Sequence, residues 1–335
     1  MSQVLVSIVI PFKNTELYIE ECIVSLINQT HKDWEAVFVD DNSTDPSLNI
    51  VKKYSKVDNR IKLLRNTGNG IIKALKTAYC HCSGNYITRM DSDDIMSPNR
   101  LEVMISSLQF YGKNHLAVGQ VKYFREDGLS EGFAKYERWL NQLTKTGSNF
   151  SEIYKECVIP SPCWMLHRED FEACDGFEPN RYPEDYDLAF RFYKANYKCI
   201  PCDEILLHWR DYSNRTSRTH EHYAANTFLD LKLDYFLELE FDNHRPLVIW
   251  GAGKKGKSIA KLLLEKQIEF HWICDNDKKI GKDIYNQKLH GFKYLKELKN
   301  PQCIVTVANE IEQAEISKYL KELNMKSMQD YFFFC

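Results

Sequence analysis

The sequence predicts an α/β protein with a large, mostly parallel, doubly wound sheet, followed by a second, smaller α/β domain. Apolar runs typical of buried strands occur at residues 4–10, 34–39, 61–64 and 86–90, and helical patterns separate them. The 335 residues are long for one domain and comfortable for two. A glycine-rich turn at residues 251–256 stands between a further apolar run and a helical pattern, which indicates another strand–helix unit near the end.

Each element of the first half has its own local signal. Residues 4–10 are almost all apolar, as in a strand that is buried on both faces, and Pro11 is expected to end it. Apolar residues then recur at helical spacing over residues 19–27, and further helices are expected at 46–54 and 70–79. Regular alternation of strands and helices favours parallel strands joined by helical crossovers.

The composition is that of an ordinary globular protein, with 44% hydrophobic and 27% charged residues. A net charge of −3 gives no support for a polyanion-binding surface. No stretch approaches the ~20 apolar residues of a membrane span, and no signal-peptide pattern is present. Eleven cysteines without framework spacing fit a reducing compartment. We therefore expect a cytoplasmic protein that contacts membranes at most peripherally.

Three carboxylates, Asp91, Asp93 and Asp94, follow the predicted strand at residues 86–90. Like charges at such short range repel by several kcal/mol unless they are compensated. Carboxylate oxygens are the hard ligands that Mg²⁺ and Mn²⁺ prefer, and such an ion usually also binds a phosphate or diphosphate. The alternative is an acidic turn that caps the next helix.

Polar residues also follow two other predicted strands. Asn14 comes after the first strand, and Asp40 and Asp41 come after the second. Ligands of doubly wound sheets bind beyond the carboxyl ends of the strands. We therefore expect these groups to converge with Asp91 and Asp93 on one rim of the sheet.

The runs at residues 7–14 (Ser-Ile-Val-Ile-Pro-Phe-Lys-Asn), 39–45 (Val-Asp-Asp-Asn-Ser-Thr-Asp) and 89–94 (Arg-Met-Asp-Ser-Asp-Asp) together resemble family 2 glycosyltransferases, which have the GT-A fold. The resemblance covers residues 4 to 220 in outline. It implies an inverting transfer of a sugar from a nucleotide-diphosphate donor, by default a UDP-sugar. It also implies a divalent cation, Mn²⁺ or Mg²⁺, on the diphosphate.

The resemblance assigns roles to single residues in the first half. Asp41 would read the base of the nucleotide, Asp91 would lie near the ribose, and Asp93 would be the direct metal ligand with Asp91 beside it. The remaining residues of the nucleotide pocket would be Pro11, Phe12 and Asn14. Lys76 is a departure, because many members have Asn there; it faces either the phosphates or solvent.

The motif Tyr-Pro-Glu-Asp-Tyr-Asp-Leu at residues 182–188 begins a predicted helix. A carboxylate within hydrogen-bond reach can take the proton of an acceptor hydroxyl. The motif resembles the Glu-Asp pair of the family, which makes Asp185 the general base and Glu184 its support or an acceptor contact. The alternative is a helix start enriched in acids because of the helix dipole. Trp164 is either a sugar-stacking residue or a core tryptophan.

Residues 208–218 form a polar, basic stretch that we expect to be a loop beyond the last strand of this domain. Family members often close the diphosphate site here with an aromatic-Arg-x-His loop. Trp-Arg at residues 209–210 matches its first part, and the Asp-Tyr that follows departs from it. Arg210, Arg215 and Arg218 are candidates to neutralise the charge of the leaving group. The alternative is a solvated surface loop.

The last third is predicted as a separate module. The expected domains are residues 1–225, a connecting helix and hinge at 226–244, and a module at 245–335. The module resembles small Rossmann-like domains found beside sugar-modifying enzymes. A possible second nucleotide site, from the Gly-x-Gly-x-x-Gly fingerprint and an acid about twenty residues later, comprises Gly251, Gly253, Gly256 and Asp275. Two roles are open for this module. It binds a nucleotide or a nucleotide sugar, or it has a structural role, for example in forming a homodimer.

The acceptor is expected to be a cell-surface or lipid-linked glycan. The pairing of such a module with residues 136–143 also resembles a minor branch of the family whose members act on queuosine in tRNA. This keeps a tRNA nucleoside open as a less favoured acceptor. The competing function is a non-catalytic protein that senses a nucleotide or nucleotide sugar.

Overall fold

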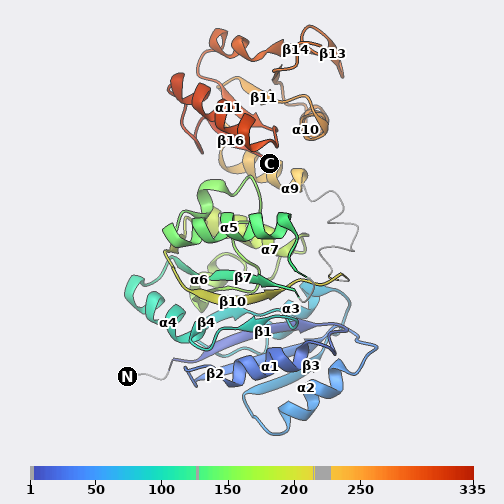
Figure 1. Ribbon diagram of the computed structural model, residues 1–335, viewed down its shortest axis with the longest axis vertical. Helices are drawn as coiled ribbons and strands as arrows, with labels where there is room; N and C mark the ends of the chain where they lie inside the picture. Colours follow the sequence, from blue (N-terminus) through green and yellow to red (C-terminus); the bar gives the residue numbers. More distant parts are fainter. Residues whose placement is uncertain (1–3, 126–127, 214, 216–227) are drawn as a thin grey trace. The chain divides into compact units, whose positions relative to one another are not determined.

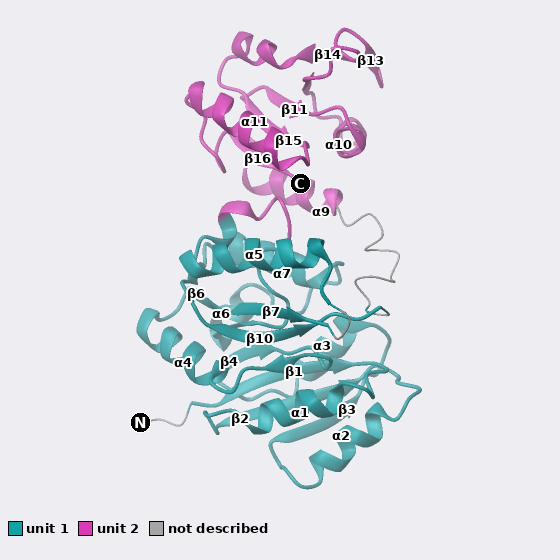
Figure 2. Ribbon diagram, viewed as in Figure 1, with its two compact units in different colours: residues 1–150, 157–218 teal, residues 151–156, 219–335 magenta. Residues whose placement is uncertain are grey.

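The computed structural model describes residues 4–125, 128–213, 215 and 228–335. These residues form two compact units (Figure 2). The first comprises residues 1–150 and 157–218, and the second comprises residues 151–156 and 219–335. Within the described ranges, none of the helices combines the length and the apolar character needed to cross a membrane.

The first unit contains a seven-stranded sheet in the order β3-β2-β1-β4-β8-β6-β9 (Figure 1). Its strands are β1 (Val6–Phe12), β2 (Trp34–Asp40), β3 (Ile61–Arg65), β4 (Tyr86–Arg89), β6 (His115–Val118), β8 (Trp164–His167) and β9 (Lys198–Ile200). The strands β3, β2, β1 and β4 are parallel, whereas β8 is antiparallel to both β4 and β6. A second sheet is formed by β5 (Ile95–Met96), β10 (Ile205–Arg210) and β7 (Gln120–Phe124). The predicted α/β class is confirmed.

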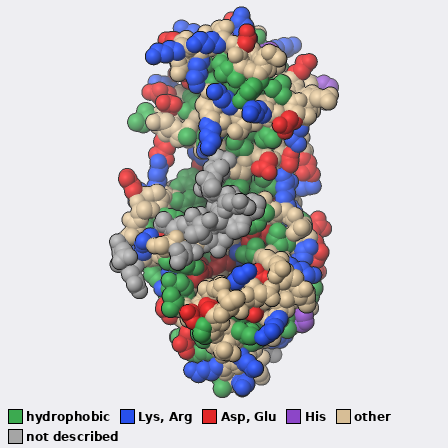
Figure 3. Space-filling model, turned by 90° about the vertical axis from the view of Figure 1, so that its right-hand side faces the viewer, with side chains coloured by type: hydrophobic (Ala, Val, Ile, Leu, Met, Phe, Trp, Pro, Cys, Tyr) green, Lys and Arg blue, Asp and Glu red, His purple; other side chains and the backbone are tan. Residues whose placement is uncertain are grey.

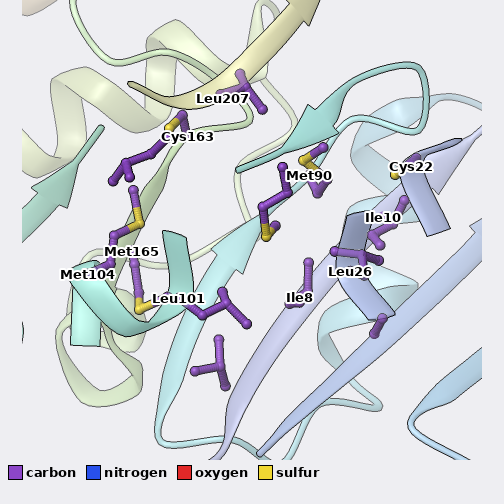
Figure 4. Close-up of a cluster of buried hydrophobic side chains, with 14 of the residues drawn as sticks. Ile8, Ile10, Cys22, Leu26, Met90, Leu101, Met104, Cys163, Met165 and Leu207 are labelled. Carbon is purple, nitrogen blue, oxygen red and sulfur yellow. The ribbon is translucent and has the colours of Figure 1, made fainter. Parts of the chain in front are cut away.

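Helices cover both faces of the large sheet (Figure 1). They are α1 (Ile19–Ile27), α2 (Ser47–Ser55), α3 (Ile71–Tyr79), α4 (Arg100–Tyr111), α5 (Glu131–Thr146), α6 (Arg168–Ala173) and α7 (Glu184–Lys194). The even-numbered residues of β1 join the apolar sides of α1 and α4 in one core. Figure 4 shows part of this core, in which Ile8 and Ile10 face Leu26 of α1. Alternate residues of each strand point to opposite faces, so both faces of β1 are buried.

Pro11 lies inside β1, although the sequence predicted that it would end the strand. A proline has no N–H group to donate to a neighbouring strand. The pairing of β1 with β4 ends at Val9 and Arg89, and the N–H of Met90 donates to the carbonyl of Val9 at 3.1 Å. Val9 and Pro11 direct their backbone polar groups to the same side. Pro11 therefore lies beyond the end of the β1–β4 pairing, and its lack of an N–H group removes no hydrogen bond from the sheet.

The second unit contains a six-stranded sheet in the order β13-β14-β12-β11-β15-β16, parallel except for the β13–β14 pair. Its strands are β11 (Leu247–Trp250), β12 (His271–Cys274), β13 (Asp283–Ile284), β14 (Gln287–Gly291), β15 (Gln302–Val305) and β16 (Tyr331–Phe333). Its helices are α9 (Leu229–Leu239), α10 (Lys254–Glu265) and α11 (Glu310–Glu322). The segment 151–156 joins this unit through Tyr154, whose ring stacks on Phe334 at 5.4 Å.

A buried carboxylate ties together the amino-terminal ends of three parallel strands in the first unit. Glu35 of β2 accepts hydrogen bonds from the Ser7 hydroxyl and from Lys62 Nζ, both at 2.6 Å. The backbone N–H and hydroxyl of Ser83 donate to it as well. Burial alone would raise the pKa of Glu35, but the hydrogen bonds from Lys62, Ser7 and Ser83 lower this pKa to about 2.

We predict that Glu35→Gln destabilises the protein in a pH-dependent way. A carboxyl whose pKa is lower in the folded state adds stability above its unfolded pKa, and this stability is lost as the pH falls toward the folded value. The wild-type protein should therefore exceed the variant by up to about 3 kcal/mol at pH 7, and the gap should narrow between pH 4.5 and pH 2. Denaturant unfolding of both proteins at pH 7, pH 4.5 and pH 2 measures this difference in stability. The exposed Glu297→Gln is the control. A gap that stays constant with pH would contradict the assignment.

Candidate active site

Three loops at the carboxyl ends of the parallel strands are joined by hydrogen bonds. The side-chain oxygen of Asn14, after β1, accepts from the N–H of Thr44, after β2, at 2.8 Å. The N–H of Thr15 donates to the Ser47 hydroxyl at 2.8 Å, and the Ser92 hydroxyl, after β4, donates to the Thr15 hydroxyl at 3.2 Å. The structure thus brings the three segments together at one rim. On the face seen in Figure 3, acidic side chains gather in a hollow of the first unit.

Asp41 is a fixed hydrogen-bond acceptor at this rim. Its side chain is buried, and its Oδ1 accepts from Asn66 Nδ2 at 2.6 Å and from the N–H of Gly70 at 3.0 Å. Its own N–H donates to the carbonyl of Phe12 at 2.8 Å. Gly70 has φ 91°, a conformation that favours glycine. The sequence analysis missed Asn66 and Gly70, which lie far from Asp41 in the chain and belong to no motif.

The three other residues expected in the nucleotide pocket differ in their exposure. Pro11 and Phe12 are buried, and the ring of Phe12 packs edge-on against Phe38 at 6.3 Å in the core. Asn14 is exposed, but its side-chain oxygen is engaged with Thr44. The side chain of Phe12 is therefore directed away from the rim, and Asn14 holds the neighbouring loop in place.

Three further candidates from the sequence are not part of the acidic cluster. Trp164 is a core residue, 2% exposed and stacked on Phe171 at 5.8 Å, which removes it as a sugar-stacking residue. Lys76 pairs with Glu178 at 3.6 Å. Arg218 lies outside the described residues.

Two of the acids after β4 differ in burial, since Asp93 is half-buried and Asp94 is fully buried. Asp93 Oδ2 accepts from the Tyr212 hydroxyl at 2.9 Å. Asp94 is completely buried; its Oδ1 accepts from the N–H of Arg210 at 2.8 Å, and its Oδ2 has no hydrogen-bond partner among the described residues. Burial raises the pKa of Asp93, and Arg215 opposes this. Burial and the charge of Asp93 raise the pKa of Asp94 well above its usual range.

Residues 208–210 belong to strand β10, so the expectation of a loop there was wrong. This strand pairs with two others: antiparallel to β5, where His208 faces Ile95, and parallel to β7. The sequence Ile-Leu-Leu-His-Trp-Arg is dominated by apolar and aromatic residues, which suit the centre of a three-stranded sheet. The polar character of the residues that follow concealed this strand.

Arg210 holds the acidic loop in place. Its Nε donates to the backbone carbonyl of Asp93 and its Nη2 to Glu21, both at 2.8 Å. The guanidinium also lies over the rings of Tyr18 and Phe124, at 4.7 and 4.6 Å from their centres. Because these contacts occupy the guanidinium, Arg210 is placed to hold the backbone at Asp93 rather than to contact a leaving group directly.

Arg215 is the predicted arginine whose charge acts most directly on the acids. It is buried, and its guanidinium lies 5.1 Å from the centre of the Trp209 ring. Burial would lower the pKa of Arg215, but the charges of Asp94, Tyr123 and Asp93 raise it. Arg215 is therefore a buried cation that interacts electrostatically with Asp93 and Asp94.

Arg100 is a second buried cation that the sequence analysis did not single out. It is completely buried at the start of α4, and its Nη2 donates to the Thr88 hydroxyl at 2.8 Å and to the carbonyl of Arg89 at 3.1 Å. Burial lowers the pKa of Arg100, and the charges of Cys163 and Asp94 oppose this. The Pro-Asn-Arg sequence at the helix start gave no sign of this role.

Arg89 connects the acidic loop to the predicted general base. The residue lies on β4 and is 5% exposed. Its Nε donates to Asp91 Oδ1 and its Nη1 to Glu184 Oε1, each at 2.9 Å. Glu184 and Asp185 are the first two residues of α7. The structure therefore brings two predicted groups, the acids after β4 and the acids at residues 184–185, to the same arginine.

Both acids at the start of α7 have raised pKa values. Burial raises the pKa of Glu184 to about 7; the charge of Asp185 adds to this and Arg89 opposes it. Burial also raises the pKa of Asp185, with Arg89 opposing. Asp185 Oδ1 accepts from the N–H of Tyr186 at 2.8 Å, and within the described part of the chain Glu184 Oε2 has no partner. A carboxyl that ionises near neutral pH is suited to general base catalysis.

The acids after β4 are suited to bind a divalent cation whose remaining ligands come from a bound phosphate compound and water. No three His, Cys, Asp or Glu side chains in the described ranges are arranged to hold an ion on their own. Mg²⁺ and Mn²⁺ commonly take one or two carboxylates and complete their shell with water and phosphate oxygens. Asp93 and Asp91 provide oxygens of this kind, and the raised pKa values of Asp93 and Asp94 show that the cluster favours added positive charge.

In the second unit, Gly251 and Gly253 lie in the turn between β11 and α10, and Gly256 lies in the first turn of α10. Gly251 has φ 118°, and a Cβ on Gly256 would lie 2.0 Å from the carbonyl oxygen of Gly251. Asp275 follows β12, and its Oδ2 accepts from the Trp250 indole N–H at 3.0 Å. The three glycines thus belong to one strand–turn–helix unit, and Asp275 is joined to this unit through Trp250, which engages one of its oxygens.

Comparisons with known proteins identify the family to which this chain belongs. The family model described as "Glycosyl transferase family 2" matches residues 7–174. The Escherichia coli protein named UDP-Glc:alpha-D-GlcNAc-diphosphoundecaprenol beta-1,3-glucosyltransferase WfgD is 41% identical over 236 residues, which cover 69% of this chain and 84% of that protein. The chain belongs to glycosyltransferase family 2. It is therefore an enzyme, and the non-catalytic alternative from the sequence is set aside.

Solved structures show the fold of this glycosyltransferase. TarS residues 1–349 from S. aureus, in complex with UDP-GlcNAc, matches with a TM-score of 0.55 and 20% identity over 77% of this chain and 71% of that one. The mannosyltransferase PcManGT from Pyrobaculum calidifontis, in complex with GDP-Man and Mn²⁺, matches with a TM-score of 0.50 and 19% identity over 77% and 69% of the two chains. The predicted GT-A fold is confirmed.

We predict that Glu184→Gln changes how stability depends on pH. A carboxyl whose pKa is raised by folding contributes stability below its unfolded pKa of about 4.5, and this contribution is lost as the pH rises through about 7. The glutamine cannot ionise. Between pH 5 and pH 8 the glycosyltransferase should therefore lose about 3 kcal/mol relative to the variant. Thermal unfolding across this range measures the difference, and parallel pH profiles would contradict the raised pKa.

Proposed function

We propose that this glycosyltransferase transfers a sugar from a UDP-sugar to an acceptor hydroxyl with inversion at the anomeric carbon, and that a divalent cation binds the diphosphate. The observation that carries the proposal is the joining of two groups of acids through Arg89, at 2.9 Å to Asp91 and 2.9 Å to Glu184. One group suits a metal–diphosphate complex, and the other suits a base. The bound UDP-GlcNAc of TarS and the bound GDP-Man and Mn²⁺ of PcManGT support this assignment.

The donor would bind along the rim formed by the loops after β1, β2 and β4. Asp41, held by Asn66 and Gly70, would accept a hydrogen bond from the base. Asp93 and Asp91 would hold the cation, which when bound neutralises diphosphate charge and makes the nucleotide a better leaving group. Arg215 would add a permanent positive charge beside them.

Asp185 would act on the acceptor. Its raised pKa makes it a stronger base than an exposed aspartate. The acceptor oxygen forms a bond to the anomeric carbon while the bond from that carbon to the diphosphate oxygen breaks. The acceptor proton passes to Asp185, and the nucleoside diphosphate leaves with the bonding electron pair. A single displacement of this kind inverts the anomeric centre.

A lipid-linked glycan is the proposed acceptor class. Support comes from WfgD, whose name specifies an acceptor sugar on diphosphoundecaprenol. Such an acceptor would bring the enzyme to a membrane surface for catalysis. Incubation with UDP-glucose or UDP-GlcNAc and a short-chain lipid-diphosphate sugar tests this, because transfer yields an extended lipid-linked product and free UDP.

We predict that Asp185→Asn lowers kcat for transfer by about 10²–10⁴-fold and leaves the Kd for the UDP-sugar within about threefold, because only the base is removed. Product formation and isothermal titration measure the two quantities. The matched control is Asp187→Asn on the same helix, where the carboxylate pairs with Arg191 at 2.9 Å. This control should reduce stability and retain transfer per folded molecule. A parallel loss of donor binding in Asp185→Asn would show that Asp185 is structural.

We predict that Asp93→Asn weakens the binding of Mn²⁺ in the presence of UDP by at least about tenfold, or ~1.4 kcal/mol. The physical reason is the loss of a charged oxygen ligand. Titration of Mn²⁺ followed by the rise in Tm measures the change. The exposed Asp203→Asn is the control. Unaltered Mn²⁺ affinity in Asp93→Asn would remove this residue from the metal site.

A further inference from the structure

Arg89 occupies an unusual position for a charged residue. It lies in the middle of the seven-stranded sheet, where its register position faces Val9 of β1, and the adjacent Thr88 faces Met165 of β8. Its side chain is 6% exposed. A buried guanidinium carries a large desolvation cost and is tolerated only when it is paired with good geometry. The structure provides two carboxylate partners.

The partners of Arg89 come from separate segments with separate roles in the proposed reaction. Asp91 is two residues after Arg89, in the loop that follows β4, and Glu184 is 95 positions away at the start of α7. Burial would lower the pKa of Arg89, but Asp91, Glu184 and Asp185 raise it, so all three carboxylates act on this one cation. Arg89 is hydrogen-bonded both to the acidic loop and to a carboxylate of the pair at residues 184–185.

We propose that Arg89 is a positioning residue that fixes the general base relative to the donor site. The inference rests on the proposed function and adds a residue to it. Arg89 is held by a rigid strand that is paired on both sides. By binding Glu184 Oε1 it anchors the first turn of α7, and Asp185 is the next residue of that turn. The distance from the base to the metal-binding acids is thereby set by one side chain.

The geometry also explains why an arginine is present. A guanidinium presents several N–H donors in a rigid fork, so Nε and Nη1 can hold two carboxylates at the same time. A lysine is a point charge on a flexible chain and would hold one carboxylate well and the other poorly. The position therefore requires both the charge and the shape of the side chain.

The experiment compares Arg89→Met with the wild-type enzyme in the transfer assay. We expect kcat to fall about 100-fold, because a misplacement near 1 Å has an effect of this size, while the donor Kd stays within about threefold. The matched control is Arg168→Met, an arginine of the same unit with a side chain 23% exposed and an Nε that donates to the Gly84 carbonyl at 2.6 Å. This control should lower Tm and keep kcat per folded molecule.

A double variant separates positioning from a general structural role. If Arg89 acts through Glu184, then Arg89→Met should lower kcat by less than about threefold when added to Glu184→Gln. Arg89→Lys keeps the positive charge and serves as a second variant if Arg89→Met does not fold. We expect it to lower kcat by about tenfold, less than Arg89→Met does.

Three results would overturn the inference: an unchanged kcat in Arg89→Met or Arg89→Lys, a parallel loss of donor binding and kcat, or effects of Arg89→Met and Glu184→Gln that multiply. Absence of transfer by the wild-type enzyme would instead reject the proposed function. The two failures are therefore distinguishable.

Discussion

The active site depends on placing several carboxylates close together in a region where they are partly or completely removed from water. Asp93, Asp94, Glu184 and Asp185 all have raised pKa values, chiefly because burial penalises their charged forms. The fold offsets this cost with cations placed among them. Arg89, Arg100 and Arg215 are all buried and lie within electrostatic reach of the acids. The remaining preference for positive charge is the physical basis of the proposal that the cluster binds a cation with a diphosphate.

The parallel sheet explains why residues from distant parts of the chain meet. Each of β1, β2 and β4 delivers a loop to the same edge, and the contacts of Thr15 with Ser47 and Ser92 join these loops. Strand β10 then places Arg210 behind the acidic loop, where it holds both the Asp93 carbonyl and, through its N–H, Asp94. The acids after β4 therefore lie in a loop that neighbouring strands hold in place, and Glu184 and Asp185 lie at a helix start. Such support positions side chains more accurately than a free loop does.

Local patterns in the sequence predicted the fold class, the four parallel strands β1 to β4 and the acidic groups that follow strand ends. Features that depend on distant partners were not predictable in this way. Residues 208–210 were expected in a loop because the polar residues that follow them conceal the pairing of β10 with β5 and β7. Three contacts join residues that no sequence periodicity relates. They are the packing of Phe12 on Phe38, the hydrogen bond from Asn66 to Asp41, and the stacking of Tyr154 on Phe334. Arg89 was visible within a motif, but its link to Glu184 required coordinates.

The most direct test of this account is a crystal structure of the enzyme with UDP and Mn²⁺, with the manganese located by its anomalous scattering. We expect a manganese peak at the carboxylate of Asp93, bound also by diphosphate oxygens, with the uracil within hydrogen-bond distance of Asp41. Well-ordered UDP on another surface, with no manganese at Asp93, would contradict it.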